Sequence, residues 1–371
     1  MRQQAVALAA MCDLEVWAML PWFPGMGLAW RWTYWKKDLS DTPREEIIDG
    51  VRVRHPRFFH VPRVGQSLSA ATFATSLLPA LASARGRFDA ILATWAYPDA
   101  VAAIVAGGLL GLPVVVQVIG SDIDVTAARP GPRRQLRWAL PRARGVIAVS
   151  APLGAAVAKL GVDERNIHII STGVDQRMFH PRDRAEARAR LGQPSVGRLI
   201  VFVGRVSEAK GVAELLNAFD KVAAGDPECR LAIIGGGPLR DECARRAAKL
   251  GGRLIVAGEI GIEGVADWIA ASDVLTLPSH HEGTPNVVLE ALGSGRRVVA
   301  SNVGGIPDLL GDARLGQLVP PRDEAALASA LAKAVQEPYD PALVASSSGT
   351  YGWDENARRI LDVVTRACPA A

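Results

Sequence analysis

The sequence predicts an α/β protein built from two parallel sheets, each covered by helices on both faces. Short β-branched runs alternate with helical patterns from one end of the chain to the other. The 371 residues suffice for two domains of ordinary size. Because both halves show the same alternation, the expected architecture is a pair of doubly wound, Rossmann-like domains that face each other across a central cleft.

The first half of the chain holds six short apolar runs that are typical of strands. An uncharged run at residues 100–118 is long enough to raise the question of a membrane span. Gly107, Gly108, Gly111 and Pro113 interrupt it, so we interpret it as a small-residue helix followed by a buried strand. The six predicted strands lie at residues 14–20, 51–55, 89–94, 114–118, 146–149 and 167–170.

A second set of six runs follows a charged span at residues 180–197, which Gly and Pro punctuate and which is the predicted linker. We therefore expect a first domain over residues 1–180 and a second over 181–352. The helical pattern at 353–371 follows a Gly/Ser-rich break and is expected to pack back onto the first domain. The predicted strands of the second half lie at residues 199–203, 231–235, 254–258, 274–278, 297–301 and 317–320.

The amino-acid composition indicates a globular protein and excludes several other classes. Hydrophobic residues make up 49% and charged residues 22%, which is typical of a globular domain and excludes a disordered or collagen-like chain. The net charge is +4, and residues 1–180 alone carry +6. This bias favours acidic substrates or an anionic membrane, but it is too diffuse for a nucleic-acid-binding face. The four cysteines lack the spacing of a zinc site or a disulfide framework, and the chain does not open with a signal-peptide pattern, so a cytoplasmic location is expected.

The most informative segment is LPSHHEGTPNVVLEALGSG at residues 277–295, where a strand is predicted to give way to a helix. Thr284 is suited to the N-cap and Pro285 to the first helical position. The backbone amides of Asn286 and Val287 would then lack intrahelical partners. Together with the positive end of the helix dipole, they favour a bound diphosphate.

Two carboxylates flank this predicted helix start. Glu282 lies just before it and Glu290 within the helix. A carboxylate at each position can accept hydrogen bonds from sugar or ribose hydroxyls beside the phosphates. The alternative is a loop charge at Glu282 and a solvated helix residue at Glu290, and the neighbouring helix start favours the binding interpretation.

A second segment, VFVGRVSEAKGVAELLNAF at residues 201–219, places two cations around a strand-to-helix loop. The strand is predicted to end at Gly204, and the helix to begin after Lys210. Cations in such a loop would stabilise the negative charge that a leaving diphosphate gathers. Arg205 can bind two oxygens, whereas Lys210 supplies a point charge. On its own the pattern also fits a surface loop.

Eight sequence blocks carry a resemblance to a known family. The blocks are TWAYPDA (94–100), LPVVVQVIGSDID (112–124), VIAVSAPL (146–153), STGVDQRMF (171–179), VGRVSEAKGV (203–212), IIGGGPLR (233–240), LPSHHEGTPNVVLEALGSG (277–295) and VVASNVGGIPDLL (298–310). In order and spacing they resemble the retaining glycosyltransferases of family 4, which have the GT-B fold. The group that acts in teichuronic-acid and exopolysaccharide assembly is the most similar, and the resemblance covers nearly the whole chain.

The resemblance implies transfer of a sugar, with retained anomeric configuration, from a UDP- or GDP-sugar to a cell-surface polysaccharide or lipid-linked glycan. Arg205 and Lys210 would bind the donor diphosphate, Glu282 the hydroxyls of the transferred sugar, and Glu290 the ribose. No metal or other cofactor is expected, because the cations and the helix dipole neutralise the leaving group. Further donor-binding positions would be Gly204, Gly283, Thr284, Pro285, Asn286 and Val287, and acceptor-side positions of the first domain would be Gly120, Ser121 and Asp122.

Two departures from the family pattern leave other interpretations open. Family members usually begin with a strand and a Gly-Gly loop, whereas Met1 falls in the following helix, so the first strand is expected to be missing. Ile119 stands where many members have a polar residue. The alternatives are a truncated or catalytically impaired nucleotide-sugar-binding protein of the same fold, and a sugar-nucleotide epimerase.

An arginine-rich segment stands out in the first domain. Six arginines surround Trp138 between Arg129 and Arg144. Such a segment is either a solvated face or an interfacial segment at an anionic membrane. The second interpretation predicts a cytoplasmic protein that lies peripherally on the inner face of the cell membrane.

Overall fold

The computed structural model describes residues 1–22, 42–60, 68–83 and 85–368. It divides into two compact units. One unit joins Met1–Ser171 with Trp353–Ala371, and the other is Thr172–Gly352. Each unit has its own parallel sheet and its own hydrophobic core.

The described part of the first unit is built on a four-stranded parallel sheet in the order β6-β7-β8-β9. Two smaller sheets, β1-β4-β3 and β2-β5, accompany it, and within them only the β3–β4 pair is antiparallel. The strand bounds are β1 (Glu15–Trp17), β2 (Leu20–Trp22), β3 (Glu45–Ile48), β4 (Val51–Arg54), β5 (Arg57–Phe59), β6 (Ile91–Thr94), β7 (Val114–Val118), β8 (Gly145–Ala148) and β9 (Ile167–Ile169).

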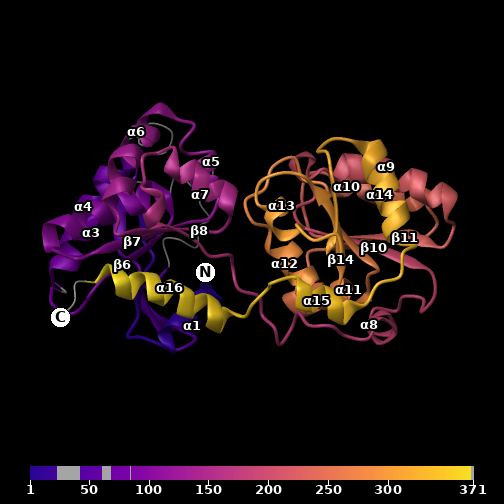
Figure 1. Ribbon diagram of the computed structural model, residues 1–371, viewed down its shortest axis with the longest axis horizontal. Helices are drawn as coiled ribbons and strands as arrows, with labels where there is room; N and C mark the ends of the chain where they lie inside the picture. The colour runs from indigo at the N-terminus through magenta and orange to yellow at the C-terminus, as the bar shows by residue number, and fades with distance from the viewer. Residues whose placement is uncertain (23–41, 61–67, 84, 369–371) are drawn as a thin grey trace. The chain divides into compact units, whose positions relative to one another are not determined.

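Helices from both ends of the chain meet on the four-stranded sheet. The C-terminal helix α16 packs alongside α1 and against β7 and β8 (Figure 1). Gln4 of α1 reaches into the core, where its Nε2 donates to Gln117 Oε1 of β7 at 2.8 Å. The helix bounds are α1 (Arg2–Ala9), α3 (Ser69–Ser83), η3 (Ala96–Ala100), α4 (Val101–Leu110), α5 (Ser121–Asp124), α6 (Pro130–Ala139), η4 (Leu140–Arg142), α7 (Ala151–Ala158), η5 (Glu164–Asn166) and α16 (Trp353–Ala367).

The second unit contains a six-stranded, all-parallel sheet in the order β12-β11-β10-β13-β14-β15. The chain winds outward from β10 in one direction and then returns to place β13 on the other side of β10. The point between β10 and β13 is therefore the topological switch point of the sheet. The bounds are β10 (Arg198–Val203), β11 (Cys229–Ile234), β12 (Leu254–Gly258), β13 (Val274–Leu277), β14 (Arg297–Ser301) and β15 (Gly316–Val319).

The helices of this unit gather in two groups about the sheet (Figure 1). Helix α9 packs against α14, while α11 packs against α8 and α12. The predicted apolar stripe of α9 is fully buried; it consists of Val212, Leu215, Leu216 and Phe219. The bounds are α8 (Arg184–Arg190), η6 (Glu208–Lys210), α9 (Val212–Gly225), α10 (Arg240–Lys249), α11 (Ile262–Ala271), α12 (Asn286–Gly293), α13 (Ile306–Leu309), α14 (Glu324–Ala334) and α15 (Pro341–Ser347).

The α/β class is confirmed, and each of the twelve predicted runs overlaps a strand. The run at 14–20 divides into β1 and β2, and the short β3 and β5 were not predicted. The uncharged run at 100–118 folds as α4 followed by the buried strand β7, as its glycines and proline indicated. Across the described residues, each helix is too short or too polar to span a bilayer.

The predicted linker at residues 180–197 is wrong. The N-terminal segment of the first unit ends at Ser171, and α8 belongs to the second unit, where it packs on α11. Arg188 is 3% exposed, and its guanidinium donates to the carbonyls of Ala271, Ser195 and Gly197 at 3.0 to 3.1 Å and to Asp273 at 2.7 Å. The buried Arg188 therefore anchors this charged segment to the second unit. The composition of the segment could not show that one of its arginines is buried.

Candidate active site

The switch point of the second unit brings together the two segments that the sequence singled out. Strand β10 ends at Val203 and is followed by Gly204 and Arg205. Strand β13 ends at Leu277 and leads into the loop that carries Glu282. Open parallel sheets bind ligands at the carboxyl ends of such strands, beside the switch point. The fold therefore places the predicted cations and carboxylate at the position where a ligand site is expected.

A lysine and a glutamate form the centre of this site. Lys210 Nζ donates to Glu282 Oε1 at 2.5 Å, and Ser279 Oγ donates to the same oxygen at 2.6 Å. The Glu282 side chain is largely buried, whereas that of Lys210 keeps about a third of its surface exposed. The carboxylate thus holds an accessible ammonium in place, which does not fit the alternative of a free loop charge.

Two glycines let the loops of the site pack backbone against backbone. Gly211 has φ +67°, and a Cβ there would lie 1.9 Å from the carbonyl oxygen of Pro278. Gly304, in the loop after β14, has φ +56°, and its Cβ would lie 1.8 Å from the Glu282 carbonyl oxygen. Side chains at these positions would collide with backbone atoms, and a positive φ also disfavours them. Glycine at these two positions therefore allows the loops that carry Lys210 and Glu282 to approach neighbouring backbone closely.

Helix α12 begins one residue later than predicted. Pro285, with φ −75° and ψ 117°, occupies the N-cap, and Asn286 is the first helical residue. Thr284 therefore lies one residue before the cap. Asn286 is exposed, and its Oδ1 accepts a hydrogen bond from Thr172 Oγ1 at 3.0 Å. Half-buried positions along the same loops are Gly204, Gly283, Thr284 and Val287.

Glu290 lies within α12 in a markedly different environment from a solvated helix residue. Burial raises the pKa of its carboxyl group to about 7. Near neutral pH the group is therefore partly protonated and can both donate and accept hydrogen bonds. A half-buried carboxyl group with a raised pKa does not fit the alternative of a fully solvated glutamate.

The structure does not bring Arg205 into contact with the Lys210–Glu282 pair. Its side chain is exposed, and no hydrogen bond or ion pair joins its guanidinium to another of the described residues. An exposed guanidinium beside the switch point is available to an incoming anion, and it can grip two oxygens at once.

The predicted acceptor-side residues follow strand β7 of the first unit, where Ser121 begins α5. Asp122 is fully buried. Its carboxylate accepts from the backbone amides of Ala96 at 2.9 Å, Ile119 at 3.1 Å and Gly120 at 2.8 Å. The Asp122 side chain thus braces two loops, and it is the surrounding backbone that lies at the carboxyl end of the sheet.

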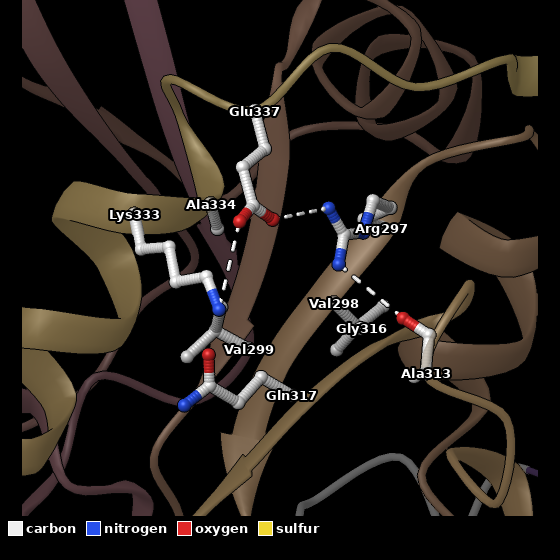
Figure 2. A pocket seen from close by; sticks show the side chains of 9 residues that line it. All are labelled: Arg297, Val298, Val299, Ala313, Gly316, Gln317, Lys333, Ala334 and Glu337. Atoms are coloured by element: carbon white, nitrogen blue, oxygen red, sulfur yellow. Dashed lines mark hydrogen bonds and ion pairs between the residues drawn. The ribbon is translucent and has the colours of Figure 1, made fainter.

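A hollow lies at the other end of the sheet in the second unit, at the amino-terminal ends of β14 and β15 (Figure 2). Its two cations are already paired, because Glu337 lies 3.1 Å from Arg297 and 3.5 Å from Lys333. Arg297 also donates to the carbonyl of Ala313. Both cations of this hollow are paired, whereas the switch point also has Arg205, which forms no hydrogen bond or ion pair with the other described residues, so the switch point is the better candidate for a diphosphate.

Comparison with known proteins finds family matches in both halves of the chain. Residues 33–177 match the family model "Glycosyltransferase Family 4", and residues 197–337 match "Glycosyl transferases group 1". The chain is 30% identical over 303 residues to TuaC of Bacillus subtilis (strain 168), a protein named as a glycosyltransferase of teichuronic acid biosynthesis. That alignment covers 81% of this chain and 75% of TuaC. The fold and these matches define a glycosyltransferase. The chain belongs to glycosyltransferase family 4.

Solved structures with a similar fold include two proteins of low sequence identity. Sucrose-phosphate synthase of Thermosynechococcus elongatus superposes with a TM-score of 0.73 at 22% identity, over 98% of this chain and 92% of that one. Anabaena HepE in complex with UDP gives 0.69 at 18% identity, over 95% and 100%. These neighbours confirm the predicted GT-B fold with its two Rossmann-like domains.

Proposed function

We propose that this glycosyltransferase transfers a sugar from a UDP- or GDP-sugar to a cell-surface polysaccharide or lipid-linked glycan, with retention of the anomeric configuration. The observation that carries the proposal is the Lys210–Glu282 pair at the switch point of the second unit. Support for a UDP-sugar comes from the HepE complex with UDP, and support for the acceptor class comes from the name of TuaC.

The donor diphosphate is proposed to bind at the start of α12. The amides of Asn286 and Val287 lie in the first turn and add to the positive end of the helix. Lys210 exchanges Glu282 for a phosphate oxygen, and Arg205 binds the same diphosphate from the opposite side of the loop. As the bond between the sugar and the diphosphate breaks, these fixed positive groups stabilise the charge on the leaving oxygen.

When Lys210 binds the phosphate in place of Glu282, the Glu282 carboxylate becomes free to bind the sugar. The released carboxylate accepts hydrogen bonds from hydroxyls of the transferred sugar, while Glu290 binds the ribose. The acceptor hydroxyl attacks the face from which the diphosphate departs, and its proton passes to the departing phosphate. No protein nucleophile is assigned to this step, and no metal is assigned to the leaving group. Residues Gly120–Asp122 of the first unit are proposed to bind the acceptor.

A basic face of the first unit supports a peripheral location at the inner face of the cell membrane. Helix α6 exposes Arg133, Arg134 and Arg137, and Trp138 beside them keeps 44% of its surface exposed. The guanidinium of Arg142 stacks 4.7 Å from the centre of the Trp138 ring. Arginines around an exposed tryptophan suit the boundary between anionic headgroups and acyl chains. Co-sedimentation with phosphatidylglycerol vesicles but not phosphatidylcholine vesicles is expected at low salt, and equal retention in the supernatant would contradict the proposal.

Titration calorimetry tests the donor site directly. The protein is titrated with UDP, GDP and ADP, alongside the variants Lys210→Ala and Glu290→Ala. We expect one nucleotide to bind, and both variants to weaken it. Failure of a folded protein to bind any of the three nucleotides would overturn the site assignment. Binding that neither variant changes would move the site elsewhere.

A further inference from the structure

A histidine joins the loop that carries Lys210 to the loop that carries Glu282. The backbone N–H of His280 donates to the carbonyl of Ala209 at 2.9 Å. Its ring Nε2 lies 2.8 Å from Glu214 Oε1, on the first turn of α9. His280 therefore contacts the chain on both sides of Lys210. It does so from a position two residues before Glu282.

The His280–Glu214 contact is largely shielded from solvent. The two side chains are 13% and 18% exposed. An ionised carboxylate only accepts hydrogen bonds, so we assign the proton to Nε2 of His280. The second oxygen of this carboxylate, Oε2, is buried and has no hydrogen-bond partner among the described residues. The ring of His280 is thus the group that satisfies Glu214, and its removal would leave a buried carboxylate unpaired.

The neighbouring contacts cannot replace this link. Gly211 touches the backbone of Pro278 and has no side chain with which to hold it. The Lys210–Glu282 ion pair is made by a long, flexible side chain, and it must open when an anion takes the ammonium. When the ion pair opens, two hydrogen bonds of His280 still join this segment to the loop after β13, and its side chain makes the one to Glu214.

We propose that His280 is a positioning residue for the donor diphosphate. Through Glu214 and Ala209 it holds the Lys210 segment against the Glu282 loop, so that the ammonium stays in place after it exchanges Glu282 for phosphate. The inference rests on the proposed donor-binding role of Lys210. It adds to that role a histidine and a glutamate that are 66 positions apart and that no spacing pattern connects.

A double-mutant cycle on UDP binding tests the inference. Dissociation constants are measured by calorimetry for the full chain and for His280→Leu, Lys210→Ala and the double variant. We expect His280→Leu to weaken UDP binding about tenfold, the size of one charged hydrogen bond. In the Lys210→Ala background the same substitution should cost less than about twofold, because a residue that acts through Lys210 has nothing left to position.

Two further variants distinguish a positioning role of His280 from a general loss of structure in the second unit. His280→Gln keeps an N–H that can donate to Glu214, so it should stay within about threefold of the wild-type affinity. His180→Ala removes an exposed histidine of the same unit and should leave UDP binding unchanged. Because His280→Gln replaces a ring by a chain of similar reach, it keeps the test available if His280→Leu does not fold.

The outcomes distinguish this inference from the proposed function. If Lys210→Ala leaves UDP binding unchanged, the donor-site assignment fails, and the inference fails with it. If Lys210→Ala weakens binding but His280→Leu costs the same factor in both backgrounds, the site stands and the positioning role is refuted. Equal losses in His280→Gln and His280→Leu would also refute it. If UDP does not bind, the cycle is run with GDP or ADP, and binding of none of them overturns site and inference together.

Discussion

The ammonium of Lys210 is paired with the carboxylate of Glu282 at 2.5 Å, so the cation proposed to bind the donor is neutralised before the donor arrives. An incoming diphosphate must replace that carboxylate. Two negative groups then compete for one ammonium, and the diphosphate gains by carrying more charge and by meeting the start of α12 as well. Glu282 therefore holds the Lys210 ammonium in position before the ligand binds, and it also competes with the ligand for that ammonium.

This competition predicts an unusual effect of Glu282→Gln. Without the carboxylate, Lys210 is free, so UDP should bind as tightly as to the wild type or up to about tenfold more tightly. A UDP-sugar should lose the extra affinity that its sugar hydroxyls contribute, because an amide accepts fewer hydrogen bonds than a carboxylate. Calorimetry with UDP and with UDP-glucose measures both effects.

The matched control for this substitution is Glu208→Gln, which removes an exposed carboxylate from the same 3-10 turn as Lys210. It should change UDP binding by less than about twofold, because exposed charges are screened. Weaker UDP binding in Glu282→Gln would show that the carboxylate supports the nucleotide and does not compete with it.

The half-buried carboxyl group of Glu290 predicts a stability that depends on pH. Burial raises its pKa to about 7 in the folded chain, against about 4.3 for a glutamate in the unfolded chain. Between these values the folded state binds a proton that the unfolded state has released, so the stability falls as the pH rises. Above about pH 7 both states are ionised, and the full cost, up to about 4 kcal/mol, is present.

Glu290→Gln should therefore be more stable than the wild type at about pH 8 and similar to it at about pH 4. Differential scanning calorimetry of the two proteins at both pH values gives the comparison. A difference in melting temperature that does not grow with pH would show that Glu290 titrates as an ordinary exposed carboxylate.

Much of the candidate site was predictable, because its signals are local in the sequence. The Gly204-Arg205 strand end and the Glu-Gly-Thr-Pro helix start each fit within a few residues, and the strand alternation placed both at carboxyl ends. The loop contact through Gly304 and the His280–Glu214 hydrogen bond were not predictable. Each joins segments that are far apart in the sequence, and a glycine or a histidine does not by itself indicate which distant residue it contacts.

The partners of buried charged residues could not be predicted from the sequence. Arg188 made α8 resemble part of a linker, although its guanidinium is satisfied entirely within the second unit. The sequence also did not predict that the carboxylate of Asp122, a proposed acceptor-side residue, accepts hydrogen bonds from three backbone amides. Composition records that a charge is present, but only the fold shows which groups satisfy it.

The bracing role of Asp122 predicts a loss of stability in Asp122→Ala. Three buried or half-buried amides, of Ala96, Ile119 and Gly120, would lose their acceptor. Each unsatisfied amide costs about 1 to 3 kcal/mol, so the substitution should destabilise the first unit by at least about 3 kcal/mol. Asp122→Asn keeps one acceptor oxygen and should cost less. Thermal unfolding of the three proteins measures the order, and equal melting temperatures would contradict it.

The buried ion pair of Arg188 and Asp273 predicts the largest effect on the second unit. Arg188→Met would leave Asp273 with a partly unpaired buried carboxylate and would free three carbonyl acceptors, so we expect a loss of about 3 to 5 kcal/mol. Asp273 would keep the Leu199 amide and Arg184, which limits the loss. The control is Arg190→Met on the same helix. Its exposed ion pair with Asp267 should contribute less than about 1 kcal/mol. Calorimetric unfolding separates the two variants, and similar stability of both would mean that α8 is not anchored through Arg188.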